Sequence, residues 1–403
     1  MIFSLYLHVP FCVSRCGYCS FYSRATGPDV RRGDALVEAW LAGVGREAER
    51  IGRIWEGRPP LRTVYIGGGT PTVLSPAVWA RLLRVLEGAF DVSGVREATV
   101  EANPCSLTDD HLRLWRDSFV TRVSLGVQSL RDDELSWLGR RHDAREALLA
   151  IEKTLAYGFD ASADLIFGLP LQTLRTWHDS LHRVVASGVG HVSAYQLTLS
   201  PHTPLGKSFE QKNFELPEGY PFYRFAQWYL ALRGLAQYEI ASFARPGGEC
   251  LHNLAYWRQE NVLALGPSAW GYLGGGWESQ ERSPDGSSCH KFKYCGGLRY
   301  HNVSTLEEYI SVSETQLPIA GAERLQGRAA KTEAAILALR TRWGIDAAAF
   351  TERWGRECRE EILGVLKSVP PRLVRIDESG ARLTPAGMRV GNAIWVELMA
   401  LDD

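Results

Sequence analysis

Residues 4–19, SLYLHVPFCVSRCGYC, join a short apolar run to three closely spaced cysteines. The run SLYLHV is too short for a typical helix and predicts a buried β-strand. Cys12, Cys16 and Cys19 follow in the loop directly behind it. This predicted strand therefore carries a cysteine loop at its carboxyl end.

Short apolar runs of the same kind recur along the first half of the chain. The six predicted strands are SLYLHV near 4, TVYIGG near 63, ATVEAN near 98, RVSLGVQ near 122, ADLIFG near 163 and HVSAYQL near 191. Amphipathic stretches lie between them, and the clearest predicted helices cover residues 34–52, 144–158 and 174–188. Strands that alternate with helices indicate parallel βα units.

Six such units predict an α/β fold, an incomplete parallel (β/α)6 barrel, because the strands are too apolar to be exposed on either face. Active sites in such barrels gather at the carboxyl ends of the strands. The residues that follow each predicted strand are therefore the candidates for function.

The composition changes beyond the sixth strand, and this change predicts two domains. We expect a barrel over residues 1–300, with a loop insertion at 274–294 on the substrate side. A helical run, two short strands and a last helix opened by Thr384-Pro385 predict an accessory domain over residues 301–403. This second domain is expected to be small, α+β and winged-helix-like.

Charge and hydropathy limit the classes of partner. The 45 basic and 46 acidic side chains nearly cancel, which disfavours a binder of nucleic acid. The apolar start of the chain is too short to cross a bilayer and lacks a basic leader. Eight cysteines are too few for a disulfide scaffold of this length, and three of them crowd together. We therefore expect a cytoplasmic protein without a membrane span that acts on a small molecule.

The spacing of Cys12, Cys16 and Cys19 predicts a metal centre. Three thiolates would leave one iron of a [4Fe-4S] cluster open, since such clusters otherwise take four cysteines. A zinc site would require a fourth ligand, and a chance group of buried thiols is the other alternative. We predict the cluster, with the three cysteines as its ligands.

The pattern Cys-x3-Cys-x-aromatic-Cys resembles the signature of the radical S-adenosylmethionine (SAM) superfamily. The flanking residues Tyr6-Leu-His8-Val-Pro10-Phe11 resemble one branch of it, and the resemblance extends over nearly the whole chain. That branch contains oxygen-independent coproporphyrinogen III dehydrogenases, haem chaperones, and methyl- or methylene-transferring enzymes of natural-product pathways. The resemblance implies reductive cleavage of SAM at the cluster to a 5'-deoxyadenosyl radical, with an electron donor such as flavodoxin or ferredoxin.

The resemblance also implies which residues hold SAM. Gly68, Gly69 and Thr70 match the positions that let backbone groups approach its methionine end. Arg140 matches a position that grips the methionine carboxylate, for which the guanidinium fork is suited, although it could instead pair with Asp143. The other implied cofactor contacts are Tyr6, Tyr18, Glu101, Gln128, Asp164 and Thr198, the last toward a second SAM. Tyr6, His8 and Arg140 are the predicted catalytic residues, since Tyr6 and His8 can both point to the barrel mouth.

Three further residues help to decide which protein class of this branch the chain resembles. Phe21 stands where coproporphyrinogen dehydrogenases carry an extra cysteine, which argues against that reaction. His252 begins the sequence His-Asn-x-x-Tyr-Trp that is typical of the haem chaperones, so it is a candidate haem contact or a helix-capping residue. Trp270 stands where those chaperones usually have histidine, which makes it a candidate substrate contact.

Trp270 and the insertion favour the natural-product branch and an aromatic or polycyclic substrate. We therefore expect a methyltransferase or cyclopropane-forming transferase that uses two SAM molecules and acts on an unsaturated carbon. The alternatives are a haem chaperone that binds and delivers haem, and oxygen-independent coproporphyrinogen III oxidation. Cys289 and Cys295 are expected to be loop cysteines.

Overall fold

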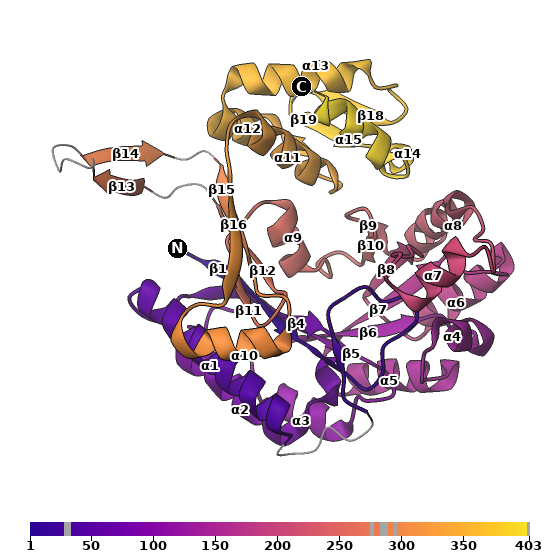
Figure 1. The fold of residues 1–403 in the computed structure, drawn as a ribbon. Coiled ribbons are helices and arrows are strands. Elements are labelled where there is room, and N and C mark those ends of the chain that lie inside the picture. Colours follow the sequence, from indigo (N-terminus) through magenta and orange to yellow (C-terminus); the bar gives the residue numbers. More distant parts are fainter. Residues whose placement is uncertain (28–33, 275–277, 283–288, 294–295, 401–403) are drawn as a thin grey trace.

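The computed structural model describes residues 1–27, 34–274, 278–282, 289–293 and 296–400. A large curved sheet occupies the middle of the molecule, and the C-terminal helices form a lobe at the top of Figure 1. The main sheet of the described residues has the strand order β16-β15-β12-β11-β1-β4-β5-β6-β7-β8-β10-β9. The six parallel strands of its centre are β1 (Phe3–Val9), β4 (Leu61–Gly68), β5 (Glu97–Ala102), β6 (Arg122–Gln128), β7 (Asp160–Phe167) and β8 (His191–Gln196).

These six strands are the six that the sequence predicts, and the parallel α/β fold is confirmed. The helices that connect them are α1 (Ala35–Ile54), α2 (Pro76–Ala89), α3 (Asp109–Arg116), α4 (Asp132–Leu138), α5 (Ala144–Ala156) and α6 (Leu174–Ala186). The predicted helices at 34–52, 144–158 and 174–188 correspond to α1, α5 and α6. Polar caps fix where helices begin, as when Asp143 accepts a hydrogen bond from the backbone N–H of Glu146 at 2.7 Å.

The barrel is open, and further strands extend the sheet on both sides. Beyond β8 lie β10 (Ser242–Ala244) and β9 (Ala236–Gln237), both antiparallel. Beyond β1 lies β11 (Val262–Leu265), which is parallel to β1. The antiparallel strands β12 (Trp270–Gly274), β15 (Gly297–Asn302) and β16 (Ile319–Leu325) follow. The sequence analysis did not identify this extension.

The two faces of the parallel strands differ in polarity. Side chains such as Leu5, Leu7 and Val64 face the helices and belong to the main apolar core. The alternate residues are polar and also buried, and they include Thr63 and Glu97. The interior of the open barrel is therefore a polar surface shielded from bulk water, which can support buried hydrogen-bonding groups.

The middle segment contributes the helices α7 (Pro204–Glu210), α8 (Gly219–Leu232) and α9 (Leu251–Trp257). Of these, α8 packs beside α6, where Trp177 Nε1 donates to the Phe222 carbonyl at 3.1 Å. The first backbone N–H groups of α9, those of Leu251 and His252, donate to the carboxylate of Glu97 on β5 at 2.9 and 3.1 Å. A carboxylate at a helix N-terminus is electrostatically favourable, so this contact anchors α9 inside the barrel.

The C-terminal unit has its own apolar core, whose residues come mainly from 325–398. Its elements are α11 (Gly327–Leu339), β17 (Ile345–Asp346), α12 (Ala347–Trp354), α13 (Arg356–Ser368), β18 (Val374–Asp377), β19 (Gly380–Leu383), α14 (Pro385–Met388) and α15 (Gly391–Met399). Its antiparallel sheet has the order β17-β19-β18. This order, a helix, a strand, two helices and then a two-stranded wing, is that of the expected winged-helix-like α+β unit. Thr384 caps α14 as predicted.

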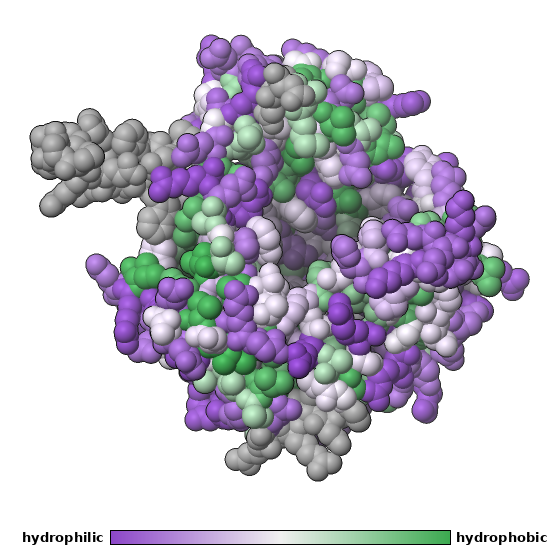
Figure 2. Space-filling model, viewed as in Figure 1, coloured by the Kyte–Doolittle hydropathy of each residue, from purple (hydrophilic) through white to green (hydrophobic). Residues whose placement is uncertain are grey.

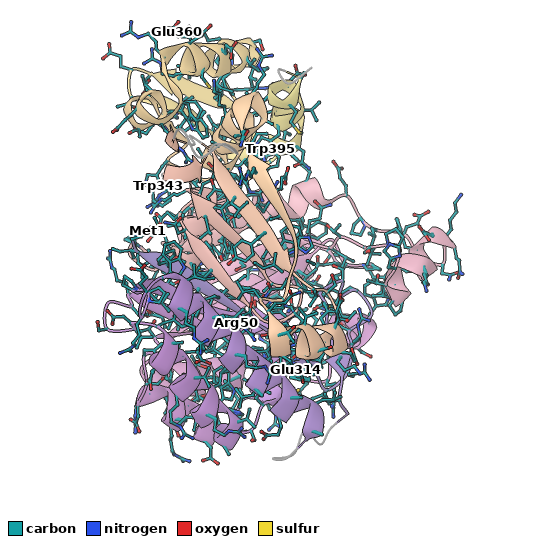
Figure 3. All side chains as sticks on the ribbon, turned by 60° about the vertical axis from the view of Figure 1, so that its left-hand side comes forward. Met1, Arg50, Glu314, Trp343, Glu360 and Trp395 are labelled. Atoms are coloured by element: carbon teal, nitrogen blue, oxygen red, sulfur yellow. The ribbon has the colours of Figure 1, made fainter. Side chains whose placement is uncertain are left out.

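Four further features lie outside the sheet order and helices given above. They are the short parallel pair β2 (Phe11–Cys12) and β3 (Arg24–Ala25), the hairpin β13 (Glu278–Arg282) and β14 (Cys289–Lys293), the helix α10 (Leu306–Thr315) and the 3-10 turn η1 (Pro71–Val73). Arg50 on α1 donates to the backbone carbonyls of Ser313 and Glu314 on α10 at 2.6 and 2.9 Å (Figure 3). Within the described residues, none of the helices combines the length and apolarity that a bilayer crossing needs.

A buried carboxyl group links α1 to α10 and to the end of β11. Glu47 on α1 accepts hydrogen bonds from Tyr309 Oη at 2.6 Å, Asn302 Nδ2 at 2.7 Å and the backbone N–H of Gly266 at 3.0 Å. Burial raises the pKa of Glu47 to about 7, although these three donors and the charge of Arg50 act in the opposite direction.

The raised pKa of Glu47 predicts a pH-dependent stability. Below its ordinary pKa of 4.5, Glu47 is protonated in both the folded and the unfolded chain. As the pH rises toward about 7, the unfolded chain ionises first, so this contribution to the free energy of unfolding falls. Over this pH range, the free energy of unfolding of Glu47→Gln should fall by about 3 kcal/mol less than that of the wild type. Urea unfolding of both proteins at about pH 5 and about pH 8 measures this difference. Equal pH dependence of the two proteins would contradict the prediction.

Candidate functional site

A cavity of about 420 Å³ opens at the carboxyl ends of the six parallel strands. In Figure 2 the face of the molecule is hollowed between the C-terminal lobe and the region of α7 and α8. Of the residues predicted from the sequence, this cavity is lined by Tyr18, Cys19, Gly68, Gly69, Thr70, Glu101, Gln128, Arg140, Asp164 and Thr198. Residues up to 180 positions apart therefore come together where the fold predicts an active site.

The three predicted cluster cysteines lie on one loop beside this cavity. Cys12, Cys16 and Cys19 are partly exposed free thiols. Thr70 Oγ1 lies 3.4 Å from Cys12 Sγ, and Arg140 Nη1 lies 3.6 Å from Cys16 Sγ. The loop is fixed from both sides, because the Gly17 carbonyl accepts from Leu205 N at 2.9 Å and the Gly17 N–H donates to the Leu138 carbonyl at 3.3 Å.

The donor set of this loop suits an iron–sulfur cluster better than a single zinc ion. A zinc site would need a fourth ligand, whereas three thiolates leave one iron of a [4Fe-4S] cluster open. The three free thiols fit the predicted cluster.

Glycines let the backbone of β4 approach the cysteine loop. A Cβ atom on Gly69 would lie 2.5 Å from the Phe11 carbonyl oxygen and 2.8 Å from that of Val9. Gly68 has a φ of +107°, and a Cβ there would lie 2.5 Å from the ring of His8. Only glycine fits at these positions without displacing the strand that leads to Cys12.

We predict that Gly69→Ala destabilises the fold by about 1 to 3 kcal/mol and weakens SAM binding, because the methyl group meets backbone that cannot move aside. Gly88→Ala is the matched control, since a Cβ at Gly88 on α2 meets no atom within 4 Å. That change should leave stability equal or slightly higher. Thermal unfolding and equilibrium dialysis with SAM measure both effects, and wild-type behaviour of Gly69→Ala would show that the close approach is not required.

Two partly buried carboxyl groups face the cavity from β5 and β7, with β6 between these strands. Glu101 accepts from the backbone N–H of Gly68 at 3.0 Å and from Tyr65 Oη at 2.8 Å. Asp164 accepts from Ser124 Oγ at 3.2 Å. Burial raises the pKa of both groups, that of Glu101 to about 7. Carboxyl groups held in this way are suited to bind the hydroxyl groups of a ribose.

Arg140 retains hydrogen-bonding capacity for a ligand. Its Nη2 donates to the Gly126 carbonyl at 2.6 Å, but its Nε is buried and has no hydrogen-bond partner among the described residues. Asp143 caps α5, so the alternative pair of Arg140 with Asp143 is not formed. An unsatisfied buried donor is costly, and a ligand carboxylate in the cavity would satisfy it.

Gln128, at the end of β6, and Thr198, after β8, also line the cavity. Gln128 has a φ of +66°, an uncommon conformation for a residue other than glycine, and it follows an irregularity in the pairing of β6 with β7. This local strain turns the end of β6 toward the cavity. Thr198 lies at the rim, where its hydroxyl donates to the Gln196 carbonyl at 3.4 Å.

Tyr6 and His8 do not line the cavity but lie behind it. Tyr6 Oη donates to His8 Nδ1 at 3.1 Å, and His8 Nε2 donates to the Tyr22 carbonyl at 3.0 Å. Burial lowers the pKa of His8 to about 4, so the imidazole is neutral. The structure therefore supports a positioning role for this pair behind Gly68 and corrects the expectation that both point into the barrel mouth.

His252 and Trp270 also lie outside the cavity. His252 is buried, its Nδ1 is hydrogen-bonded to Thr63 Oγ1 at 2.9 Å, and its ring packs between Tyr65 and Tyr256. Its Nε2 is also buried and has no hydrogen-bond partner among the described residues, and the role of His252 as a haem contact stays a prediction. Trp270 is half exposed on β12 and lies in a different cavity.

Several lining residues were not identified from the sequence. They are Tyr65 on β4, Asn103 directly after β5 in the chain, and Tyr195 on β8. Tyr65 and Tyr195 alternate with the buried apolar residues Val64, Ile66 and Ala194 of their strands, so the two-residue period of the strands could have found them. Cys289 lies in β14, and Cys295 lies outside the described residues.

Comparisons with known proteins agree with this geometry. Residues 6–184 match the family model of the Radical SAM superfamily, and residues 325–390 match the HemN C-terminal domain. The chain is 32% identical to the heme chaperone HemW of Bacillus subtilis, over 97% of this chain and 98% of the relative. It is 33% identical to HemW of Mycobacterium tuberculosis, over 90% of this chain and 87% of the relative.

A solved structure is similar over almost the whole chain. The coproporphyrinogen III oxidase HemN of Escherichia coli, described as a radical SAM enzyme, has a TM-score of 0.78. The match covers 98% of this chain and 89% of HemN at 21% sequence identity. At that identity the likeness shows the shared fold, including the open parallel sheet and the C-terminal unit.

Proposed function

Because this chain belongs to the radical SAM superfamily, in the branch of the HemN and HemW proteins, we propose that it is a haem chaperone that holds an iron–sulfur cluster and SAM in the strand-end cavity. The proposal rests on the convergence of Cys19, Arg140 and the carboxyl groups Glu101 and Asp164 on one cavity, with Cys12 and Cys16 on the loop beside it. The haem part rests on relatives named heme chaperone HemW that match the chain over most of its length.

When both are bound, the cluster supplies an electron for the reductive cleavage of SAM. The residues of this chain would do the rest by binding and orientation. Cys12, Cys16 and Cys19 would hold three irons, and Arg140 would bind the methionine carboxylate through its guanidinium fork. Glu101 and Asp164 would accept hydrogen bonds from the ribose hydroxyls.

The glycine backbone after β4 and the ring of Tyr18 would form opposite walls around the cofactor. The backbone of Gly68 and Gly69 would lie along its methionine end, and Tyr18 would pack on the adenine. The Tyr18 side chain is partly buried in the cavity wall, and burial raises the pKa of its hydroxyl. Tyr6 and His8 would fix the position of this backbone from behind rather than touch the cofactor.

Phe21 disfavours the oxidation of coproporphyrinogen. Its side chain is exposed at the cavity wall, next to Cys19, and it cannot supply the thiol that the dehydrogenases are expected to have there. HemN supports the fold of this chain, and at its identity it supports no more.

Methyl or methylene transfer, which the sequence analysis favoured, has no support from the comparisons. Trp270, the candidate substrate contact for such a transfer, lies outside the strand-end cavity. A volume of about 420 Å³ lies within the range of sites that bind one ligand of moderate size. We therefore propose one SAM, with flavodoxin or ferredoxin as the electron donor in the cytoplasm.

An anaerobic experiment separates the two functions. The cluster is reconstituted, dithionite and methyl-deuterated SAM are added, and 5'-deoxyadenosine is analysed for deuterium by mass spectrometry, with a parallel titration of haem. Saturable binding of haem with no deuterium in 5'-deoxyadenosine supports the chaperone. Deuterium in that product together with S-adenosylhomocysteine and without saturable haem binding would establish methylene transfer instead.

A further inference from the structure

A small recess lies beside the cysteine loop, apart from the strand-end cavity. Its volume is about 20 Å³, and Cys16 is among the residues that line it. The exposed residues of its lining are Ser14, Cys105, Gly139 and Arg141, so the recess opens on the surface of the protein. Nothing described so far uses this surface.

The recess and the strand-end cavity meet different cysteines of the loop. Cys19 lines the strand-end cavity, whereas Cys16 lines the recess and not that cavity. Arg140 stands between Cys16 and the strand-end cavity, since Arg140 lines that cavity and its Nη1 lies 3.6 Å from Cys16 Sγ. Thr70 and Asn103 line both spaces and so form part of the wall between them. A cofactor that fills the strand-end cavity would therefore leave the recess side of Cys16 open.

The recess is too small to hold an organic electron donor. A volume of about 20 Å³ has room for about one water molecule. A nicotinamide or a free flavin needs a pocket of about 300 Å³ or more. A donor that uses this side of the loop must therefore rest on the surface around the recess, as a protein partner does.

Two arginines give this surface a positive charge. Arg15, between Cys12 and Cys16 in the chain, and Arg141, in the lining of the recess, are both exposed. Among the described residues, neither guanidinium forms an ion pair or a hydrogen bond. None of the residues that line the recess is acidic.

Arginines and carboxylates of the adjoining helices are already engaged. Arg113 on α3 pairs with Asp110 at 2.7 Å, and Arg131 before α4 pairs with Asp133 at 2.7 Å. The carboxylate of Asp143, two residues after Arg141, caps the first turn of α5. The charges of Arg15 and Arg141 are therefore available to a partner, and they favour one with an acidic surface.

We propose that the face around this recess is the docking surface for flavodoxin, an acidic one-electron carrier, and that Arg15 and Arg141 attract it. This rests on the proposed function, because it supposes a cluster on the cysteine loop, and it adds where the electron enters. The carrier loses one electron and the cluster gains it, with no bond formed or broken. In flavodoxin the flavin lies at the carboxyl ends of the strands, so its edge can approach a shallow recess without entering it. Complexes of redox partners bury little area, so a few charges contribute much of their recognition.

Titration of the reconstituted full-length protein with flavodoxin tests the surface, together with the rate at which reduced flavodoxin bleaches the visible absorbance of the cluster. We expect the double variant Arg15→Glu with Arg141→Glu to weaken the dissociation constant about tenfold or more at low salt, because the surface then repels the carrier. Arg15→Lys with Arg141→Lys keeps the charge and should retain most of the affinity. Arg96→Glu is the matched control, since Arg96 is exposed at the opposite end of β5 from Cys105 and forms no ion pair with a described residue.

Dithionite serves as the second electron donor, because so small an ion needs no docking surface. It should reduce every variant, and iron content and SAM binding should stay at the wild-type level. Weaker binding and slower reduction by flavodoxin in the double variant, with wild-type behaviour of Arg96→Glu, supports the surface.

Two results would overturn the surface and leave the proposed function standing. One is equal binding of flavodoxin by the wild type and the double variant, and the other is no saturable binding by the wild type. Binding of ferredoxin in place of flavodoxin would overturn the choice of carrier. A wild-type protein that holds no iron after reconstitution would overturn the proposed function itself.

Discussion

Replacing Cys16 by alanine is expected to leave the reconstituted protein without its iron–sulfur cluster. Cys16 is one of three free thiols on the loop, and no fourth cysteine lies in the Cys12–Cys19 segment to take its place. A cluster with two remaining protein ligands would not be held. The measurements are iron and sulfide per chain and the visible absorbance after anaerobic reconstitution, and all three should fall to the background level.

Cys105→Ala provides the matched control for this prediction. Cys105 lines the same small recess as Cys16, but it is exposed, and its thiol lies 3.4 Å from Asn103 Oδ1. Cluster content should therefore stay at the wild-type level. Retention of the cluster by Cys16→Ala, or its loss from Cys105→Ala, would show that the three-cysteine assignment is wrong.

The second large effect is expected for Arg140→Ala, which should weaken SAM binding by about 10- to 100-fold. Hydrogen bonds to charged groups contribute about 1.5 to 3 kcal/mol, and Arg140 Nε has no hydrogen-bond partner among the described residues. Arg140→Lys should restore only part of the affinity, because an ammonium group cannot bind a carboxylate in the bidentate way of a guanidinium. Equilibrium dialysis of the reconstituted protein with SAM measures the dissociation constants.

Arg141→Ala is the control for this series, since Arg141 is the next residue but is exposed. Its affinity for SAM should match the wild type. Iron content must be measured beside affinity, because Arg140 also lies near Cys16. If Arg140→Ala kept both its cluster and its full affinity for SAM, the assigned role in carboxylate binding would be wrong.

The parallel half of the fold could be predicted because its signals are local. Each of the six strands is a short apolar run, and each is separated from the next by a helix with a recognisable period. The strands β11 to β16 gave no comparable signal. The run of β11 is only four residues, and its partner β1 lies more than 250 positions earlier in the chain. Pairing of this kind depends on tertiary packing rather than on local preference.

The site could be predicted where residues end strands, and less well elsewhere. Glu101, Gln128 and Asp164 lie where the barrel rule places them, at adjacent strand ends. For Tyr6 and His8, alternation along the strand indicates the face but not the depth, and both lie behind the cavity wall. For His252 the motif indicates a helix start, yet only the hydrogen bonds of Glu97 with α9 show that this helix is inside the barrel.

The position of β1 has a consequence for the order of events during synthesis. This strand carries the cysteine loop and lies between β4 and β11, so its second neighbour is made only when the ribosome has passed Leu265. A nascent chain shorter than that leaves one edge of β1 with unpaired backbone groups, and such edges attract other strands. The loop that is translated first is therefore among the last parts to acquire its complete support, and loading of its metal would follow late in biogenesis.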